Sequence, residues 1–152
     1  MEFSDILTVI GVVLLALGSG TFWSFSTGVM PGLRRTDDET FVTAMRSINR
    51  AVINPMFLVP IFAPAVVLAW AGIIEIHGPR GWMLVGAGVV YFVGAVVVTI
   101  GGNVPLNAAL ESSTSPSGAT RSAFERRWNV LNGVRSGASV CALILAALAL
   151  VL

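Results

Sequence analysis

The sequence has very few of the residues from which metal, haem and disulfide sites are built. Its 152 residues include one cysteine, Cys141, and one histidine, His77. A single cysteine cannot form a disulfide within the chain, and haem or metal sites usually need several His or Cys ligands or clustered carboxylates. We therefore expect no internal disulfide and no bound cofactor, whether haem, flavin, iron or copper.

Charged residues are also scarce. Only 11% of the residues are charged, the net charge is +1, and none of the nine basic residues is a lysine. A soluble domain usually has about 25% charged residues, and a near-neutral chain without a basic cluster offers no field that would attract nucleic acid. Hydrophobic residues make up 55% of the chain, and the mean hydropathy is +0.85. Such a surface needs a lipid bilayer as its partner and excludes a nucleic-acid-binding function.

Four apolar stretches approach the length of about 20 residues that a helix needs to span a bilayer. They cover residues 6–29, 53–74, 82–102 and 134–152. The acidic start of the chain and the lack of a cleavage motif indicate that the first stretch is a retained span rather than a signal peptide. We expect the fourth helix to begin earlier, near Ser122, because Ser122 and Glu125 match a capping box. The sequence predicts an all-α fold, a four-helix transmembrane bundle formed by residues 1–152 as a single domain.

The connections between the spans predict the orientation of the bundle. In the first connection, Asp37 or Asp38 can cap a short cytoplasmic helix that runs from Glu39 to about Arg50, before the second span. Eight of the nine arginines lie in the first and third connections, and Arg80 lies alone in the second. Positive residues stay on the cytoplasmic side of a membrane. We expect a multi-pass protein of the bacterial inner membrane with both termini outside the cytoplasm.

Small residues recur at every fourth position of the first span, at Ala16, Gly20, Ser24 and Gly28. Such a ridge lets helix backbones approach closely in lipid, where no hydrophobic force drives helices together. Two interpretations are open: close packing inside the monomer, and a homo-oligomer formed through the ridge.

Polar side chains gather at the predicted cytoplasmic ends of the spans. They are Asn49, Asn54, Asn103, Asn107, Glu125, Trp128, Asn132 and Arg135. The last four lie at offsets of 0, 3, 7 and 10 residues, which places them on one face of a helix. An unpaired amide or guanidinium in hydrocarbon is costly, so these groups must face one another or a cavity. They form either a hydrogen-bonded clasp between helices or the lining of a pocket that opens toward the cytoplasmic leaflet.

The same regions carry a family resemblance. Gly20-x-Phe22-x-Ser24-Phe25 and Val29-Met30-Pro31-Gly32-Leu33 resemble the start of the anthrone oxygenase-like family, also called domain of unknown function 1772. Ala44-Met45-x-x-Ile48-Asn49-Arg50 with Asn54-Pro55, then Asn103-Val104-Pro105-Leu106-Asn107, continue the resemblance in the same order. Phe124-Glu125-x-x-Trp128-x-x-x-Asn132-x-x-Arg135 completes it, so that the resemblance covers nearly the whole chain.

The resemblance implies an integral membrane fold and a candidate chemistry. Fungal members of the family oxidise a polyketide anthrone to an anthraquinone with dioxygen, without a bound metal or flavin. An anthrone is a carbon acid whose anion is an electron-rich aromatic alkoxide. Such an anion can pass an electron to dioxygen directly, so the protein needs only to bind the molecule, remove a proton and stabilise the anion.

Roles follow for the polar residues. As catalytic residues we expect Arg135 and Asn103 to hold the developing oxyanion, and Glu125 to act as the base, with Glu111 in reserve. The alternative for Glu125 is an ion pair with Arg121 or a site on the cytoplasmic surface. Trp128 offers a flat surface for a polycyclic ring. The expected substrate-binding residues are Asn49, Asn54, Asn107, Trp128 and Asn132.

Two function classes therefore compete. The first is a membrane-embedded, cofactor-independent oxygenase, or at least a binder, of a lipophilic aromatic molecule such as an anthrone or quinone. It requires a pocket between the second, third and fourth spans, lined by Asn49, Asn103, Trp128 and Arg135. The second is a non-enzymatic membrane subunit or small transporter-like component, which requires that the polar groups pair completely with one another.

Overall fold

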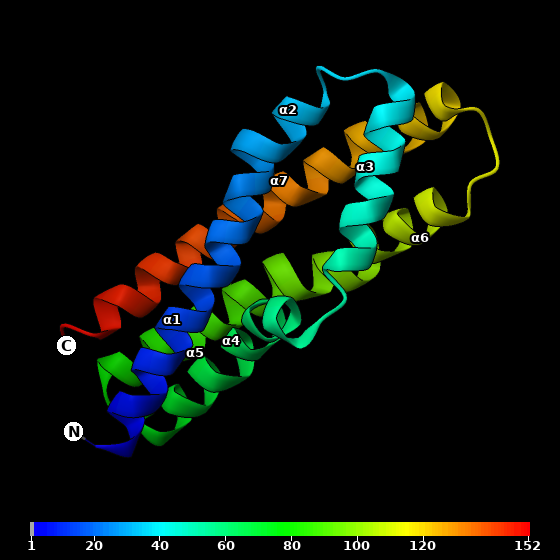
Figure 1. The fold of residues 1–152 in the computed structure, drawn as a ribbon. Coiled ribbons are helices and arrows are strands. Elements are labelled where there is room, and N and C mark those ends of the chain that lie inside the picture. The colour runs from blue at the N-terminus through cyan, green and yellow to red at the C-terminus, as the bar shows by residue number, and fades with distance from the viewer. Residues whose placement is uncertain (1) are drawn as a thin grey trace.

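The fold, taken from a computed structural model that describes residues 2–152, consists of helices joined by short connections (Figure 1). The first span is continuous from Phe3 to Leu33 and comprises α1 (Phe3–Ser24), the π-helical segment η1 (Phe25–Val29) and α2 (Met30–Leu33). The remaining elements are α3 (Asp38–Ala51), α4 (Pro55–Ile74), α5 (Pro79–Tyr91), the π-helical η2 (Phe92–Val97) and η3 (Thr99–Asn103), α6 (Val104–Ser112) and α7 (Ser117–Ala149).

Four of these helices or helix series are long and apolar enough to cross a membrane. They are Phe3–Leu33, Pro55–Ile74, Pro79–Ser112 and Ser117–Ala149. The prediction of an all-α four-helix transmembrane bundle is thus confirmed, and the protein is a multi-pass membrane protein. Both chain ends lie at one end of the bundle, whereas α2, α3 and α6 lie at the other end (Figure 1).

The predicted start of the fourth helix is wrong. The helix begins at Ser117, with Pro116 as its N-cap, and no capping box forms at Ser122. Ser122 lies inside α7, where its hydroxyl donates to the carbonyl of Gly118. The capping-box pattern is local, but the first turns of α7 are held by distant groups, because Arg121 donates to backbone carbonyls of the first connection.

Two apolar clusters form the interior. The larger cluster fills the bundle between α1, α4, α5 and α7 and contains Leu15, Leu68, Leu84 and Tyr91, none of which is accessible. The second cluster, the end cluster, lies where α2, α3, α6 and α7 meet. It consists of Met30, Phe41, Val42, Met45, Leu110, Phe124 and Trp128. The end cluster extends the apolar core beyond the four-helix part of the molecule.

Polar contacts fasten both ends of the bundle. At the end with the termini, Arg80 pairs with Asp5 at 2.8 Å and with Glu75 at 3.3 Å, which joins the start of α1 to the α4–α5 turn. At the opposite end, Arg46 of α3 donates to the carbonyls of Leu110 and Ser113. These contacts hold α3 against α6.

The ridge of small residues lies on the outside of α1. Ala16, Gly20, Ser24 and Gly28 are all exposed, and a Cβ added at Gly20 or Gly28 would meet no atom within 4 Å. The ridge therefore does not pack inside the monomer. A homo-oligomer formed through this ridge stays a prediction.

Candidate ligand-binding cavity

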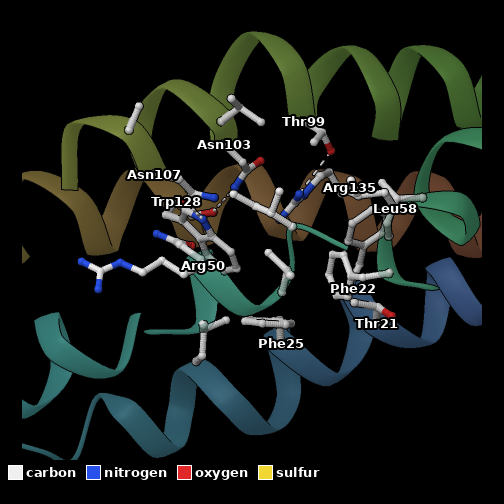
Figure 2. A pocket seen from close by; sticks show the side chains of 18 of the residues that line it. Thr21, Phe22, Phe25, Arg50, Leu58, Thr99, Asn103, Asn107, Trp128 and Arg135 are labelled. Carbon is white, nitrogen blue, oxygen red and sulfur yellow. Dashed lines mark hydrogen bonds between the residues drawn. The ribbon is translucent and has the colours of Figure 1, made fainter. Parts of the chain in front are cut away.

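A cavity of about 380 Å³ lies inside the bundle and is lined by residues of both apolar clusters, Phe22 and Ile61 of the larger one and Trp128 of the end cluster (Figure 2). Its walls come from α1 and η1, the end of α3, the first turns of α4, the η3–α6 region and α7. The lining is mostly apolar, with a few polar side chains among aromatic and aliphatic ones. Both the volume, within the usual range of about 300–1,000 Å³, and this lining are typical of small-molecule sites.

Arg135 forms one wall of the cavity and is only 7% exposed. Its Nη1 donates to the hydroxyl of Thr99 at 3.2 Å, and its Nη2 donates to Oδ1 of Asn132 at 2.7 Å. The guanidinium lies 4.5 Å from the centre of the Phe22 ring. Its Nε–H has no partner, and no carboxylate within residues 2–152 pairs with it. A buried cation is therefore held by neutral groups and an aromatic face.

Three asparagines line the cavity with Arg135 (Figure 2). Oδ1 of Asn103 and Nδ2 of Asn49 are buried without a hydrogen-bond partner. Oδ1 of Asn107 accepts from the indole Nε1 of Trp128 at 2.9 Å, which fixes both side chains. Buried polar groups are almost always hydrogen-bonded. Oδ1 of Asn103, Nδ2 of Asn49 and Nε of Arg135 are thus buried polar groups of cavity-lining residues whose hydrogen-bonding capacity is unused.

Trp128 supplies an aromatic wall. It is buried and lines the cavity, and its ring centre lies 5.5 Å from that of Phe25. The Arg135 guanidinium lies 5.4 Å from the Trp128 ring. A flat ligand in the cavity would meet Trp128, Phe22 and Phe25 together with the positive charge.

Five of the eight predicted site residues line the cavity, and three lie elsewhere. Asn54 caps α4, since its Oδ1 accepts from the amide of Phe57. Asn132 lies behind the wall, where its Nδ2 donates to the Phe22 carbonyl and to the Ser26 hydroxyl. Glu125 accepts from Nε of Arg121 at 2.7 Å. The Glu125 carboxylate is thus engaged in the alternative ion pair, away from the cavity lining.

Sequence reasoning left several lining residues out of the expected site. Phe22 and Phe25 come from the first span, which we did not expect to contribute, although both stand in the family-like pattern of that span. Arg50 and Glu111 also line the cavity, and both Nε and Nη2 of Arg50 donate to Oε1 of Glu111. Glu111 is the reserve candidate for the base, and it is the carboxylate present in the cavity lining.

π-helical segments occur on two walls of the cavity. Phe25 begins η1, and Thr99 and Asn103 begin and end η3. A π-turn adds a residue to the helical turn and so changes the direction of the side chains that follow, and such turns occur frequently at functional sites. Here they lie where Phe25, Thr99 and Asn103 face the cavity.

Metal ligands do not gather at this site. Across residues 2–152, no group of three or more His, Cys, Asp or Glu side chains is arranged to hold a metal ion. What the cavity offers a ligand is one guanidinium, amide groups, aromatic rings and one Arg–Glu pair.

The fold and the cavity define a helical membrane bundle with an internal, mostly apolar cavity that contains a guanidinium and amide groups. The profile of the anthrone oxygenase family matches residues 44–145, about two thirds of the chain. The chain therefore belongs to the anthrone oxygenase family, as the resemblance predicted. No curated protein and no solved structure matches it. Arg135, Trp128 and the three lining asparagines fall inside the matched range, whereas Phe22 and Phe25 precede it.

Proposed function

We propose that the protein binds a lipophilic aromatic molecule with an acidic C–H or O–H group and oxidises it with dioxygen. The observation that carries the proposal is the Arg135 guanidinium, buried on the cavity wall without a carboxylate partner. An unpaired buried charge costs several kcal/mol, and an anionic ligand oxygen would offset that cost. The aromatic walls suit a planar ring system.

The proposed reaction is that of an anthrone-like carbon acid. A base removes one proton from the central CH₂ group, and the negative charge moves to the ring oxygen as an aromatic alkoxide. This oxygen would accept hydrogen bonds from Nε of Arg135 and Nδ2 of Asn49. Because these donors are held in place and partly shielded from water, they stabilise the anion more than water does.

Dioxygen is the oxidant in the next steps. The anion passes one electron to dioxygen, and the resulting carbon radical and superoxide combine to form a C–O bond. Protonation gives a hydroperoxide, which loses water to leave a carbonyl group. One anthrone and one dioxygen thus yield one anthraquinone and one water. The protein would contribute orientation, proton transfer and stabilisation of charge.

We assign the role of base to Glu111. Its carboxylate lines the cavity beside Asn107 and Ala108, and both bonds from Arg50 reach Oε1. Glu125, the residue first expected in this role, is paired with Arg121 of the same helix and does not line the cavity. We assign Glu125 a structural role.

The test is oxidation of 1,8-dihydroxyanthrone by protein reconstituted in lipid nanodiscs, followed by the absorbance of the anthraquinone product. Protein-free nanodiscs give the rate of spontaneous oxidation. Removing one charge-assisted hydrogen bond costs about 1.5–3 kcal/mol, so Arg135→Gln should lower the protein-dependent rate at least about tenfold. Arg126→Gln, which changes an exposed arginine of the same helix, is the matched control and should keep the rate.

Thermal melting separates a functional effect from a folding defect. Arg135→Gln should melt close to the unsubstituted protein, because Asn132 keeps its bonds to α1. A protein-dependent rate that is zero for the unsubstituted chain, or equal for Arg135→Gln and Arg126→Gln, would contradict the proposal. That result would favour the non-enzymatic membrane subunit.

A further inference from the structure

Both ends of the cavity are closed by packed side chains. Toward α2 and α3 lies the end cluster, whose members are all buried, and the bonds from Arg46 to the carbonyls of Leu110 and Ser113 hold α3 over it. Toward the termini lies the larger apolar cluster, in which Tyr91 donates to the carbonyls of Pro60 and Ile61. A ligand cannot reach Arg135 along the bundle axis without unpacking one of these clusters.

The side of the cavity, unlike its two ends, is not closed by buried side chains, because several of the lining residues there are exposed. They are Arg50, Ile53, Leu58, Val104, Ala108 and Glu111. The first three come from the end of α3, the connection that follows it and α4, and the last three come from α6. Along its length α4 packs mainly against α1 and α5 and reaches η2, and no comparable packing joins it to η3 or α6 among the described residues. The exposed residues therefore frame a side opening between the α3–α4 connection and α6.

The chemistry of this side opening changes along α6. Val104 and Glu111 are seven residues apart, or about 10 Å along a helix. The Arg50–Glu111 pair spans the opening at the end nearer the third connection. Deeper toward the bundle centre, the rim is apolar, with Ile53 75% exposed and Val104 50% exposed. Exposed apolar side chains on membrane-spanning helices face lipid, whereas a charged pair belongs near the headgroups.

We propose that the cavity is filled sideways from the bilayer, by a neutral weak acid dissolved in the lipid, through this side opening. A water-borne anion would have to cross a packed cluster or an apolar rim, and a charge in hydrocarbon is costly. The neutral molecule passes the rim, and its proton leaves only after its oxygen lies beside Arg135. The inference rests on the proposed function for the kind of ligand, but the route can be tested without any substrate.

The test uses Ile61→Cys in a Cys141→Ser background, reconstituted in nanodiscs. Ile61 lines the cavity and is 3% exposed. The probes are N-phenylmaleimide, which is uncharged and dissolves in lipid, and a phenylmaleimide that carries a sulfonate. Ile53→Trp with Val104→Trp adds bulk to both sides of the opening. Met56→Trp with Ile100→Trp is the matched control, because these exposed residues of α4 and η3 lie three and four residues from Ile53 and Val104 but do not line the cavity.

N-phenylmaleimide should modify the introduced thiol. The rim pair, Ile53→Trp with Val104→Trp, should slow that reaction by about fivefold or more, because it narrows the opening through which the probe enters. The control pair should leave the rate unchanged, and the sulfonated probe should react far more slowly. Equal rates in the rim and control pairs, equal rates for the two probes, or no modification at all would each overturn the inference.

Phe57→Cys, a second lining position, replaces Ile61→Cys if that variant does not fold. Loss of anthrone oxidation alone would overturn the proposed function and leave this route intact.

Discussion

Arg135 and Asn132 are neighbouring polar side chains of α7 that have different roles: Arg135 lines the cavity, and Asn132 holds Arg135 and binds α1. Asn132 accepts from Arg135 through Oδ1 and donates to α1 through Nδ2. The amide thus links the guanidinium to the Phe22 carbonyl, while Nε of Arg135 is buried without a hydrogen-bond partner. Because Arg135 finds neutral partners rather than a carboxylate, its charge stays available to a ligand.

Substitution by glutamine should have different effects at Glu111 and at Glu125. Glu111→Gln should lower anthrone oxidation by about a hundredfold or more, since a positioned general base contributes about that factor. Glu125→Gln should keep the rate but lower the free energy of unfolding by about 1.5–3 kcal/mol, because it removes a charge-assisted bond to Arg121. The rate of anthrone oxidation and the melting temperature of both variants show which glutamate is the base. A loss of rate in Glu125→Gln without a loss of stability would return the role of base to Glu125.

At the scale of elements, close helix contacts decide where the spans pack. Gly94 of η2 faces α7, and a Cβ added there would lie 2.2 Å from Cβ of Ala138. Gly86 of α5 has no atom within 4 Å of such a Cβ. The two glycines belong to the same span, yet only Gly94 lies in a tight contact.

Gly94→Ala should therefore destabilise the bundle by about 1–3 kcal/mol, the usual result of overpacking. Gly86→Ala should be neutral or stabilise the protein by up to about 1 kcal/mol, since alanine favours the helix. Thermal unfolding in nanodiscs measures both. Equal melting temperatures for the two variants would show that η2 and α7 do not pack as closely as described.

The N-cap of α3 gives an element-scale prediction on pH. Asp37 accepts from the backbone amide and the hydroxyl of Thr40, and these bonds lower the pKa of Asp37 from its ordinary value of 3.8. The lowered pKa means that this cap stabilises α3 above pH 3.8 and that its contribution is lost as the pH falls below that value. Asp37→Asn keeps an oxygen acceptor but does not titrate. Its melting temperature should fall less than that of the unsubstituted protein between neutral pH and pH 3, and an identical fall would contradict the role of Asp37.

Arginines and exposed aromatic residues are distributed unequally between the two ends of the molecule. Exposed Phe3, Trp70 and Trp82 belong to the end with the chain termini, where aromatic residues would lie at a membrane interface. Most arginines lie around α2, α3, α6 and the start of α7. This asymmetry agrees with an orientation in which that end faces the cytoplasm.

Labelling of introduced cysteines tests the orientation. In a Cys141→Ser background, Gly78→Cys and Ser117→Cys should react with an impermeant reagent from opposite sides of the membrane. Gly78 tolerates a side chain, because an added Cβ meets nothing closer than 3.9 Å. The thiol at position 117 should be reached only from the cytoplasmic side. Labelling of both from the same side would contradict the four-span topology.

The sequence alone was sufficient for the all-α fold and its four spans. Hydropathy over about 20 residues identifies a span, because every backbone group in lipid must be bonded within its own helix. The family resemblance also followed from residues that can be read directly, such as Asn103 and Arg135.

Only the tertiary structure decided which polar side chains share the cavity. Glu125, Trp128, Asn132 and Arg135 occupy one helical face, but that face is wide enough to touch several neighbouring elements. Trp128 and Arg135 therefore line the cavity, while Asn132 binds α1 and Glu125 binds Arg121. Glu111 and Phe22 join the site from other helices, because the packing of separate spans sets their distance and the local pattern does not.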